Sequence, residues 1–159
     1  MDRNTLREFI NTIWVYYTTH GRLFDWRNID DPYKVVVSEI MLQQTQTNRV
    51  IEKYRRFIHA FPTFESLAHA SRQEVLMYWQ GLGYNRRGMY LQQIAQKVVA
   101  EFDGHLPQDP KILETFPGIG KATAGSICAF AFNLPTVFIE TNIRSVYIHF
   151  FFGAKKDIS

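Results

Sequence analysis

The sequence has a single cysteine, Cys128, among 159 residues. A single thiol excludes a disulfide within these residues, and it also excludes a zinc or iron–sulfur site that needs several cysteine ligands from them. Cys128 stands in an apolar run, so we expect it to be a small buried hydrophobic side chain. A reducing compartment fits this cysteine usage best, and we therefore expect an intracellular protein of the cytosol or nucleus.

Long hydrophobic runs are missing, and neither sign of charge dominates. The apolar stretches are too short to span a bilayer, and the first residues lack the apolar core of a signal peptide, so we expect no membrane partner. Lys plus Arg number 18 against 15 Asp plus Glu, which gives a formal net charge of +3. This mild excess permits nucleic-acid binding without arguing for it. Hydrophobic residues make up 46% of the chain, enough for a packed core.

Apolar residues recur at helical spacing along nearly the whole chain, most clearly over residues 50–61 and 90–102. Strand-like alternation is not sustained anywhere. Residues that typically begin helices stand at Asp31-Pro32, at Thr63, at Ser71 with Glu74, and at Asp109-Pro110. We therefore expect an all-α fold of eight or nine short helices.

The stretch LETFPGIGKATAGSICAFAF, residues 113–132, places two glycines and a lysine between two predicted helices. A helix N-terminus presents N–H groups and a partial positive charge, and glycines let a phosphate come close to the backbone. Gly118 and Gly120 would allow that approach, and Lys121 and Thr123 would add side-chain donors. Small residues after the turn, Ser126 among them, would let two helices cross tightly. The stretch predicts a site for a DNA phosphate, with an ordinary helix connection as the alternative.

With its neighbours this turn resembles the helix–hairpin–helix of the HhH-GPD superfamily of base-excision DNA glycosylases. WRNIDDPYKVVVSEIMLQQTQ, residues 26–46, is similar to the signature of MutY-type adenine DNA glycosylases, and GLGYNRR, residues 81–87, is similar to their next signature. The resemblance covers about residues 14–150. It implies the all-α helix–hairpin–helix glycosylase fold, truncated at its C-terminus.

The same resemblance suggests how the chain is divided. Residues 26–150 would form the HhH-GPD helical domain. Residues 1–25 would contribute an N-terminal helix to a second, incomplete helical subdomain, and residues 151–159 would be a tail or a truncated continuation.

Glu39 is the candidate general acid. Hydrolysis of the glycosidic bond to adenine requires protonation of the departing base and stabilisation of a cationic sugar, which two carboxyl groups in different environments can supply. Glu39 is flanked by apolar residues over positions 35–42, a setting that raises the pKa of a carboxyl group. The resemblance places Glu39 on the family's catalytic glutamate. A glutamate on a helix surface is the alternative.

Glu140 is the candidate second carboxylate, and here the sequence departs from the family. Relatives normally have Asp-Gly-Asn in the loop after the hairpin, whereas this chain has Glu140-Thr141-Asn142. Glutamate keeps the charge but is longer by one methylene, and catalytic placement tolerates only about half an ångström. Glu140 would stabilise the sugar cation or, as the alternative, only cap the helix that begins near Asn142.

Residue 122 bears on the type of reaction. Bifunctional relatives such as endonuclease III carry a lysine at the corresponding place, whereas this chain has Ala122, and other relatives have Ser or Tyr. Lys121 would point about 100° away around the helix. We therefore expect hydrolysis by water, a monofunctional glycosylase, rather than a Schiff-base intermediate.

The remaining site residues follow from the resemblance. Gln43 and Gln44 would fill the gap left by the extruded base, with Thr45 beside them, and Tyr84 would insert next to the lesion. Candidate phosphate contacts are Arg86, Arg87, Asn142 and Arg144. The base pocket would be bordered by Trp26, Arg27 and Leu42, with a core place for Trp26 and a solvated charge at Arg27 as the alternative.

The expected function is removal of a mismatched adenine, such as one opposite 8-oxoguanine, from double-stranded DNA by a monomeric protein in the cytoplasm, nucleoid or nucleus. No cofactor or metal is expected, because the family's iron–sulfur cluster needs four cysteines, although a monovalent cation at the hairpin backbone stays open. Alternatives are excision of thymine or uracil, a non-catalytic binder of mismatched or abasic DNA, and a helical protein without a DNA role.

Overall fold

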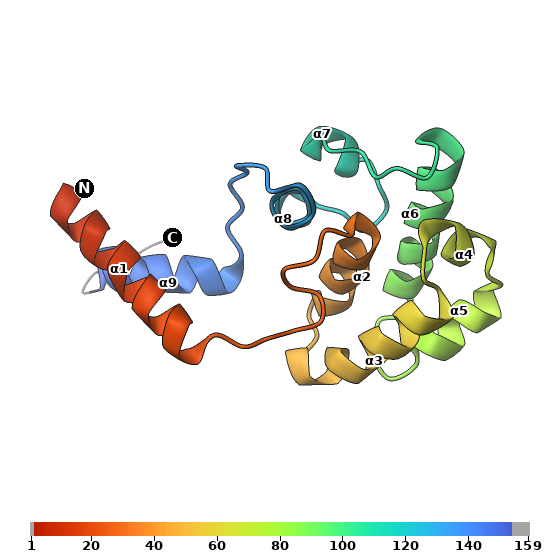
Figure 1. Ribbon diagram of the computed structural model, residues 1–159, viewed down its shortest axis with the longest axis horizontal. Coiled ribbons are helices and arrows are strands. Elements are labelled where there is room, and N and C mark those ends of the chain that lie inside the picture. Colours follow the sequence, from red (N-terminus) through yellow and green to blue (C-terminus); the bar gives the residue numbers. More distant parts are fainter. Residues whose placement is uncertain (1, 154–159) are drawn as a thin grey trace. The chain divides into compact units, whose positions relative to one another are not determined.

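A computed structural model describes residues 2–153 of the chain (Figure 1). Within these residues it contains nine α-helices and no strand, which confirms the all-α prediction. The chain divides into two compact units, one of residues 24–138 and one of residues 1–23 together with residues 139–159. None of the described helices combines the length and apolar character that crossing a bilayer requires.

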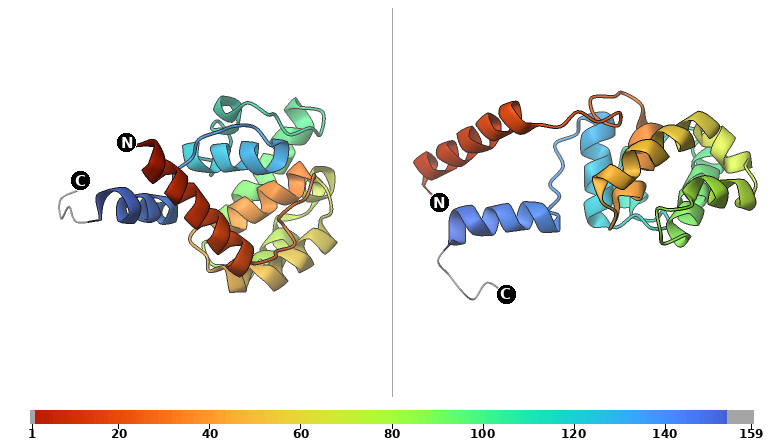
Figure 2. Two further views of the ribbon diagram at one scale, coloured as in Figure 1. Left: turned by 60° about the vertical axis from the view of Figure 1, so that its left-hand side comes forward. Right: turned by 90° about the horizontal axis from the view of Figure 1, so that it is seen from below.

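The larger unit is arranged around one central helix, α2. Its helices are α2 (Pro32–Leu42), α3 (Thr47–Ala60), α4 (Phe64–His69), α5 (Arg72–Trp79), α6 (Arg86–Glu101), α7 (Pro110–Leu113) and α8 (Lys121–Phe132). Helices α3, α6 and α8 each pack against α2, while α4 and α5 pack on α6 and α7 packs beside α8. Figures 1 and 2 show α8 lying against α2 in each view.

The helices begin at the capping residues that were identified in the sequence. The side chain of Asp31 accepts a hydrogen bond from the backbone N–H of Lys34, and Pro32 follows at the first helical position. Ser71 and Glu74 form a reciprocal capping box at the start of α5. These bonds satisfy backbone N–H groups that have no partner inside the helix, so the local chemistry of the sequence fixes the helix starts.

Helix α2 is apolar on every side, and this character explains its central place. Its residues from Val35 to Met41 are all buried, and two of them, Ser38 and Glu39, are polar. A buried carboxyl group is costly unless polar neighbours surround it. Burying Glu39 therefore lowers the stability of the fold relative to an apolar residue at this position. A buried carboxyl group with such a cost is a candidate functional group.

The smaller unit pairs the two ends of the chain, α1 (Arg3–His20) and α9 (Thr141–Phe152). The ring of Phe9 on α1 contacts those of Tyr147, Phe150 and Phe151 on α9, with centroid distances of 5.5, 4.9 and 5.0 Å. The predicted domain of residues 26–150 would include most of α9, whereas these ring contacts group α9 with α1. Boundaries at residues 25 and 150 therefore stay a prediction.

Candidate active site and DNA-binding face

Glu39 is a residue of α2 with 8% of its surface exposed, and its side chain meets α8. Its Oε2 atom lies 2.7 Å from the Oγ atom of Ser126, and its Oε1 atom lies 3.6 Å from Nη1 of Arg27. Glu39 is therefore buried, as its apolar neighbours in sequence predicted, and is not a surface glutamate, although its carboxyl oxygens meet a hydroxyl and a guanidinium. Its role as an acid stays a prediction at this point.

The three residues predicted to border a base pocket take different places. Arg27 is half-buried, and its guanidinium lies 4.1 Å from the ring centroid of Phe130, next to Glu39. Leu42 packs against the core at the end of α2. Trp26 lies within the core, only 2% exposed and stacked on Phe24, which is the second of the two places that the sequence left open for it.

The glycine turn before α8 has two glycines with different tasks. Gly118 has a φ of +76°, and a Cβ atom built on it would lie 2.7 Å from Cδ2 of Tyr90. Gly120 is the N-cap residue of α8, and a Cβ atom there would meet nothing within 4 Å. Gly118 therefore shapes the turn, while Gly120 leaves open space in front of the first N–H groups of α8.

The side chain of Gln43 joins the end of α2 to the glycine turn. Its Nε2 atom donates to the carbonyl oxygen of Gly118 at 3.1 Å and lies 3.3 Å from Oγ1 of Thr123. Gln44 and Tyr84, the other residues predicted to enter DNA, are exposed and have φ angles of +52° and +47°. Such angles are uncommon outside glycine and occur often at functional sites, so these loops are held in unusual conformations.

Arg87 is the residue whose place the sequence analysis predicted wrongly. It was expected to contact phosphate, but it is 8% exposed and lies beneath both loops. Its guanidinium donates to six acceptors: the carbonyl oxygens of Ile40, Met41, Gln43, Leu82 and Gly83, and Oγ1 of Thr45. Burial lowers the pKa of Arg87, and the nearby Tyr84 opposes this shift. Its Nε atom has no partner, but both terminal nitrogens are bound to acceptors inside the protein, so this buried guanidinium is not available to DNA.

Comparison with known proteins identifies the fold that carries this site. Residues 37–158 match the family described as HhH-GPD superfamily base excision DNA repair protein. The chain belongs to this superfamily. The predicted resemblance and the predicted fold are thereby confirmed.

Relatives within the superfamily are adenine DNA glycosylases. The chain is 45% identical to the adenine DNA glycosylase of Homo sapiens, covering 87% of this chain and 27% of that protein. It is 38% identical to the adenine DNA glycosylase of Buchnera aphidicola, covering 90% of this chain and 41% of that protein. The chain thus spans less than half the length of these curated relatives.

One solved structure is similar to this chain in fold. The structure of a thermostable thymine-DNA glycosylase matches with a TM-score of 0.84 at 27% sequence identity, covering 91% of this chain and 67% of that one. The likeness extends over nearly the whole chain. It does not depend on the hairpin alone, which many proteins share.

The two glycines of the superfamily's hairpin are expected to differ in how much stability is lost when each is changed to alanine. Gly118→Ala is expected to lower the free energy of unfolding by about 2 kcal/mol or more, because alanine resists the left-handed backbone and its methyl group meets Tyr90. Gly120→Ala is expected to lower it by less than about 1 kcal/mol, as for other changes at an N-cap. Urea unfolding of both variants measures the difference.

The same pair separates stability from DNA binding. Because a methyl group at Gly120 stands in the open space before α8, we expect Gly120→Ala to weaken binding to a short duplex while the protein stays folded. Equal duplex affinity of Gly120→Ala and the unchanged protein would contradict a phosphate site at this turn.

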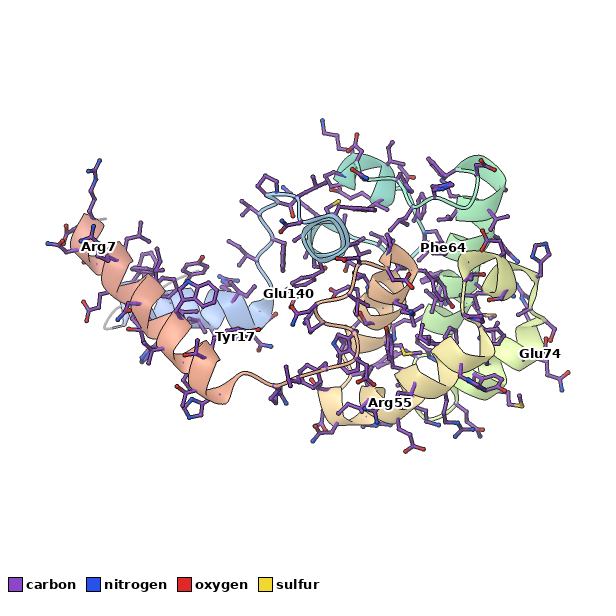
Figure 3. The ribbon with its side chains drawn as sticks, in the orientation of Figure 1. Arg7, Tyr17, Arg55, Phe64, Glu74 and Glu140 are labelled. Atoms are coloured by element: carbon purple, nitrogen blue, oxygen red, sulfur yellow. The ribbon has the colours of Figure 1, made fainter. Side chains whose placement is uncertain are left out.

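Glu140, Asn142 and Arg144, three further predicted site residues, belong to the unit of α1 and α9. Glu140 is the N-cap residue of α9 and is labelled at its start in Figure 3. Its side chain makes no capping hydrogen bond, so the alternative that it only caps the helix gains no support. The roles of these three residues stay predictions.

Cofactor binding is not indicated by the described side chains. Residues 2–153 contain no group of three or more His, Cys, Asp or Glu residues that could hold a metal ion. Cys128 is buried as expected, with its Sγ atom 3.3 Å from the carbonyl oxygen of Gln108, and burial raises the pKa of its thiol. The cation at the hairpin backbone and the lack of a cofactor both stay predictions.

A surface hollow of about 350 Å³ lies at the opposite end of α2 from Glu39. Asp31, Tyr33 and Phe64 are among its lining residues, and it contains none of the predicted site residues. The hollow lies at the starts of α2 and α4, and its lining also includes Leu106 and Gln108 before α7 and Phe132 at the end of α8. The chemistry of this protein is therefore better sought at Glu39 than at this hollow.

Proposed function

We propose that this chain carries the catalytic helical domain of a base-excision DNA glycosylase that hydrolyses the glycosidic bond of a mismatched adenine. The observation that carries the proposal is the Glu39 carboxyl group, buried on α2 and in contact with α8, the helix that begins at the glycine turn. An acid held next to a DNA-backbone site is the arrangement that base excision requires.

In this mechanism Glu39 donates its proton to the departing adenine. The Glu140 carboxylate would stabilise the positive charge that develops on the sugar as the bond breaks. Water then completes the hydrolysis, because Ala122 offers no amine at the place where bifunctional relatives have lysine.

Binding of double-stranded DNA would use the open start of α8 and the two exposed loops. The N–H groups after Gly120 would hold a phosphate, and the exposed Gln44 and Tyr84 would enter the duplex around the extruded nucleotide. Gln43 would have to leave Gly118 and Thr123 to join them. We further propose a monomer that acts on nuclear or nucleoid DNA.

Two alternative functions have specific support. Excision of thymine is supported by the likeness to the thymine-DNA glycosylase structure. Binding of mismatched or abasic DNA without catalysis is supported by two departures from the family, Glu140 in place of aspartate and Ala122. These alternatives concern the substrate and the rate, and all three functions use the same DNA-binding face.

A single-turnover assay on a panel of duplexes separates these functions. We expect release of adenine from an 8-oxoguanine:adenine duplex, and no release from matched duplexes. Release of thymine or uracil instead would favour the second function, and tight binding without release of any base would favour the third. Absence of salt-sensitive binding to every duplex would contradict a DNA role altogether.

A further inference from the structure

Helix α3 carries as much excess positive charge as the whole chain. It has one carboxylate, Glu52, and four cations, Arg49, Lys53, Arg55 and Arg56. The excess of three positive charges on this helix equals the formal net charge of +3 of the full sequence. The rest of the chain is therefore neutral on balance, and the positive charge that attracts a polyanion is concentrated on α3.

Three of the four cations form a row on one side of α3. Arg49, Lys53 and Arg56 follow one another at spacings of four and three residues, which place them on the same helix face. Arg55 lies about 100° away from Arg56 around the helix and pairs with Asp25 instead. We call Arg49, Lys53 and Arg56 the α3 basic row, and it spans about 10 Å along the helix.

The α3 basic row is not neutralised by carboxylates. None of the ion pairs within residues 2–153 involves Arg49, Lys53 or Arg56, although Glu52 lies on the same helix. Arg49 stands in the first turn of α3, where the helix dipole disfavours a cation, and this turn has no acidic residue. Cations gathered without carboxylate partners repel one another, so their presence favours a role in binding an anion.

The row begins beside the loop that carries Tyr84. The Nη2 atom of Arg49 donates to the carbonyl oxygen of Gly81 at 2.6 Å. A Cβ atom built on Gly81 would lie 3.5 Å from Nζ of Lys53, so this ammonium group lies next to the same glycine. Tyr84 follows three positions later and is exposed. The loop of residues 43–45 leads directly into α3, so the row starts next to both loops that would enter DNA.

We propose that the α3 basic row binds backbone phosphates of the DNA beside the two exposed loops. The proposal rests on the proposed function, in which these loops enter the duplex. Phosphates of one strand recur about every 3.4 Å along the duplex axis, so a row of about 10 Å can face up to three of them. Arg49 and Arg56 are exposed and Lys53 is half-buried, so their N–H groups can reach a phosphate and form charge-assisted hydrogen bonds.

This contact would add a second DNA-backbone site to the glycine turn before α8. Contacts to phosphate position a protein on the duplex without reading the bases. The α3 basic row would therefore contribute to affinity equally on matched and mismatched DNA, while the choice of base would be made elsewhere.

The test measures the duplex affinity of Lys53→Gln and Arg56→Gln at several salt concentrations. Each variant is expected to weaken binding by about three- to tenfold, the effect of one hydrogen bond to the backbone. Each should also reduce the slope of log affinity against log salt by about one, because one fewer phosphate is neutralised. Glutamine is nearly as good a helix former as lysine or arginine, so α3 should stay folded.

Arg55→Gln is the matched control. Arg55, labelled in Figure 3, is an exposed cation of the same helix, but it lies outside the row and pairs with Asp25. Its loss removes the same charge and should leave the salt slope unchanged. An unchanged slope in both Lys53→Gln and Arg56→Gln, or an equal reduction in Arg55→Gln, overturns the proposal.

The affinity measurement does not depend on catalysis, which separates this proposal from the proposed function. Reduced slopes in the two row variants support the α3 basic row even if no base is released, and that result would reject only the glycosylase activity. Base release with unchanged slopes would reject only the row. Absence of salt-sensitive binding by the unchanged protein would reject both.

Discussion

Glu39→Gln is expected to lower the single-turnover rate of base release by about 10²- to 10⁴-fold, the usual contribution of a general acid. Glutamine has nearly the same shape as glutamate but has no acidic proton to give. Its amide can still meet the Ser126 hydroxyl that lies 2.7 Å from Oε2 in the unchanged protein. The variant should therefore stay folded and keep its affinity for the duplex, so that only the chemical step is slowed.

The measurement compares release rates at saturating protein with duplex affinities obtained separately. Glu114→Gln is the control, because Glu114 is an exposed glutamate just before the glycine turn and undergoes the same chemical change. It should leave the rate within a factor of about two, since its carboxyl group has no part in proton transfer. A Glu39→Gln variant that released base as fast as the unchanged protein would remove Glu39 from the mechanism.

Arg87→Ala is expected to lower the free energy of unfolding by about 3 kcal/mol or more. Alanine removes the donor shared by six acceptors, and leaves several of those carbonyl oxygens buried without a partner. It also opens a cavity next to Trp79, whose ring centroid lies 5.6 Å from the guanidinium carbon. For a chain of this length the loss corresponds to a fall in melting temperature of roughly 6–12 °C.

Calorimetry of Arg87→Ala, Arg86→Ala and Arg87→Lys distinguishes the loss of the buried hydrogen bonds from the loss of a positive charge. Arg86→Ala removes the same charge from the neighbouring exposed position and should change the melting temperature by about 1–2 °C at most. Arg87→Lys keeps the charge but cannot reach acceptors in both loops, so its stability should lie between the other two. Equal melting temperatures for Arg86→Ala and Arg87→Ala would show that the buried network contributes little.

Features set by neighbouring residues could be predicted from the sequence. The capping groups at Asp31 and at Ser71 with Glu74 act within one turn of helix, and the helices begin there. The burial of Glu39 followed from the apolar residues on both sides of it, because a helix that is apolar all round must lie inside. The fold itself followed from a resemblance carried by residues 26–46 and 81–87, which the family match confirms.

Features set by helix packing could not be predicted. Ser126 meets Glu39 across 87 positions of sequence, and Arg87 meets Ile40 across 47. A serine among small residues resembled a spacer between helices, and an arginine beside Arg86 resembled a second surface cation. One signal was available for Arg87, because it would lie one turn beyond the glycines of GLGYNRR and could face inward with the loop.

The shared use of Arg87 by two loops also has a consequence for local opening. One loop consists of residues 43–45 and the other of residues 82–83, and both lie outside the helices. The guanidinium of Arg87 forms hydrogen bonds to both loops. If one loop separates from Arg87, the other loses part of its support at the same moment. The two segments should therefore exchange their backbone amide hydrogens as a single cooperative unit, although about forty residues separate them in the chain.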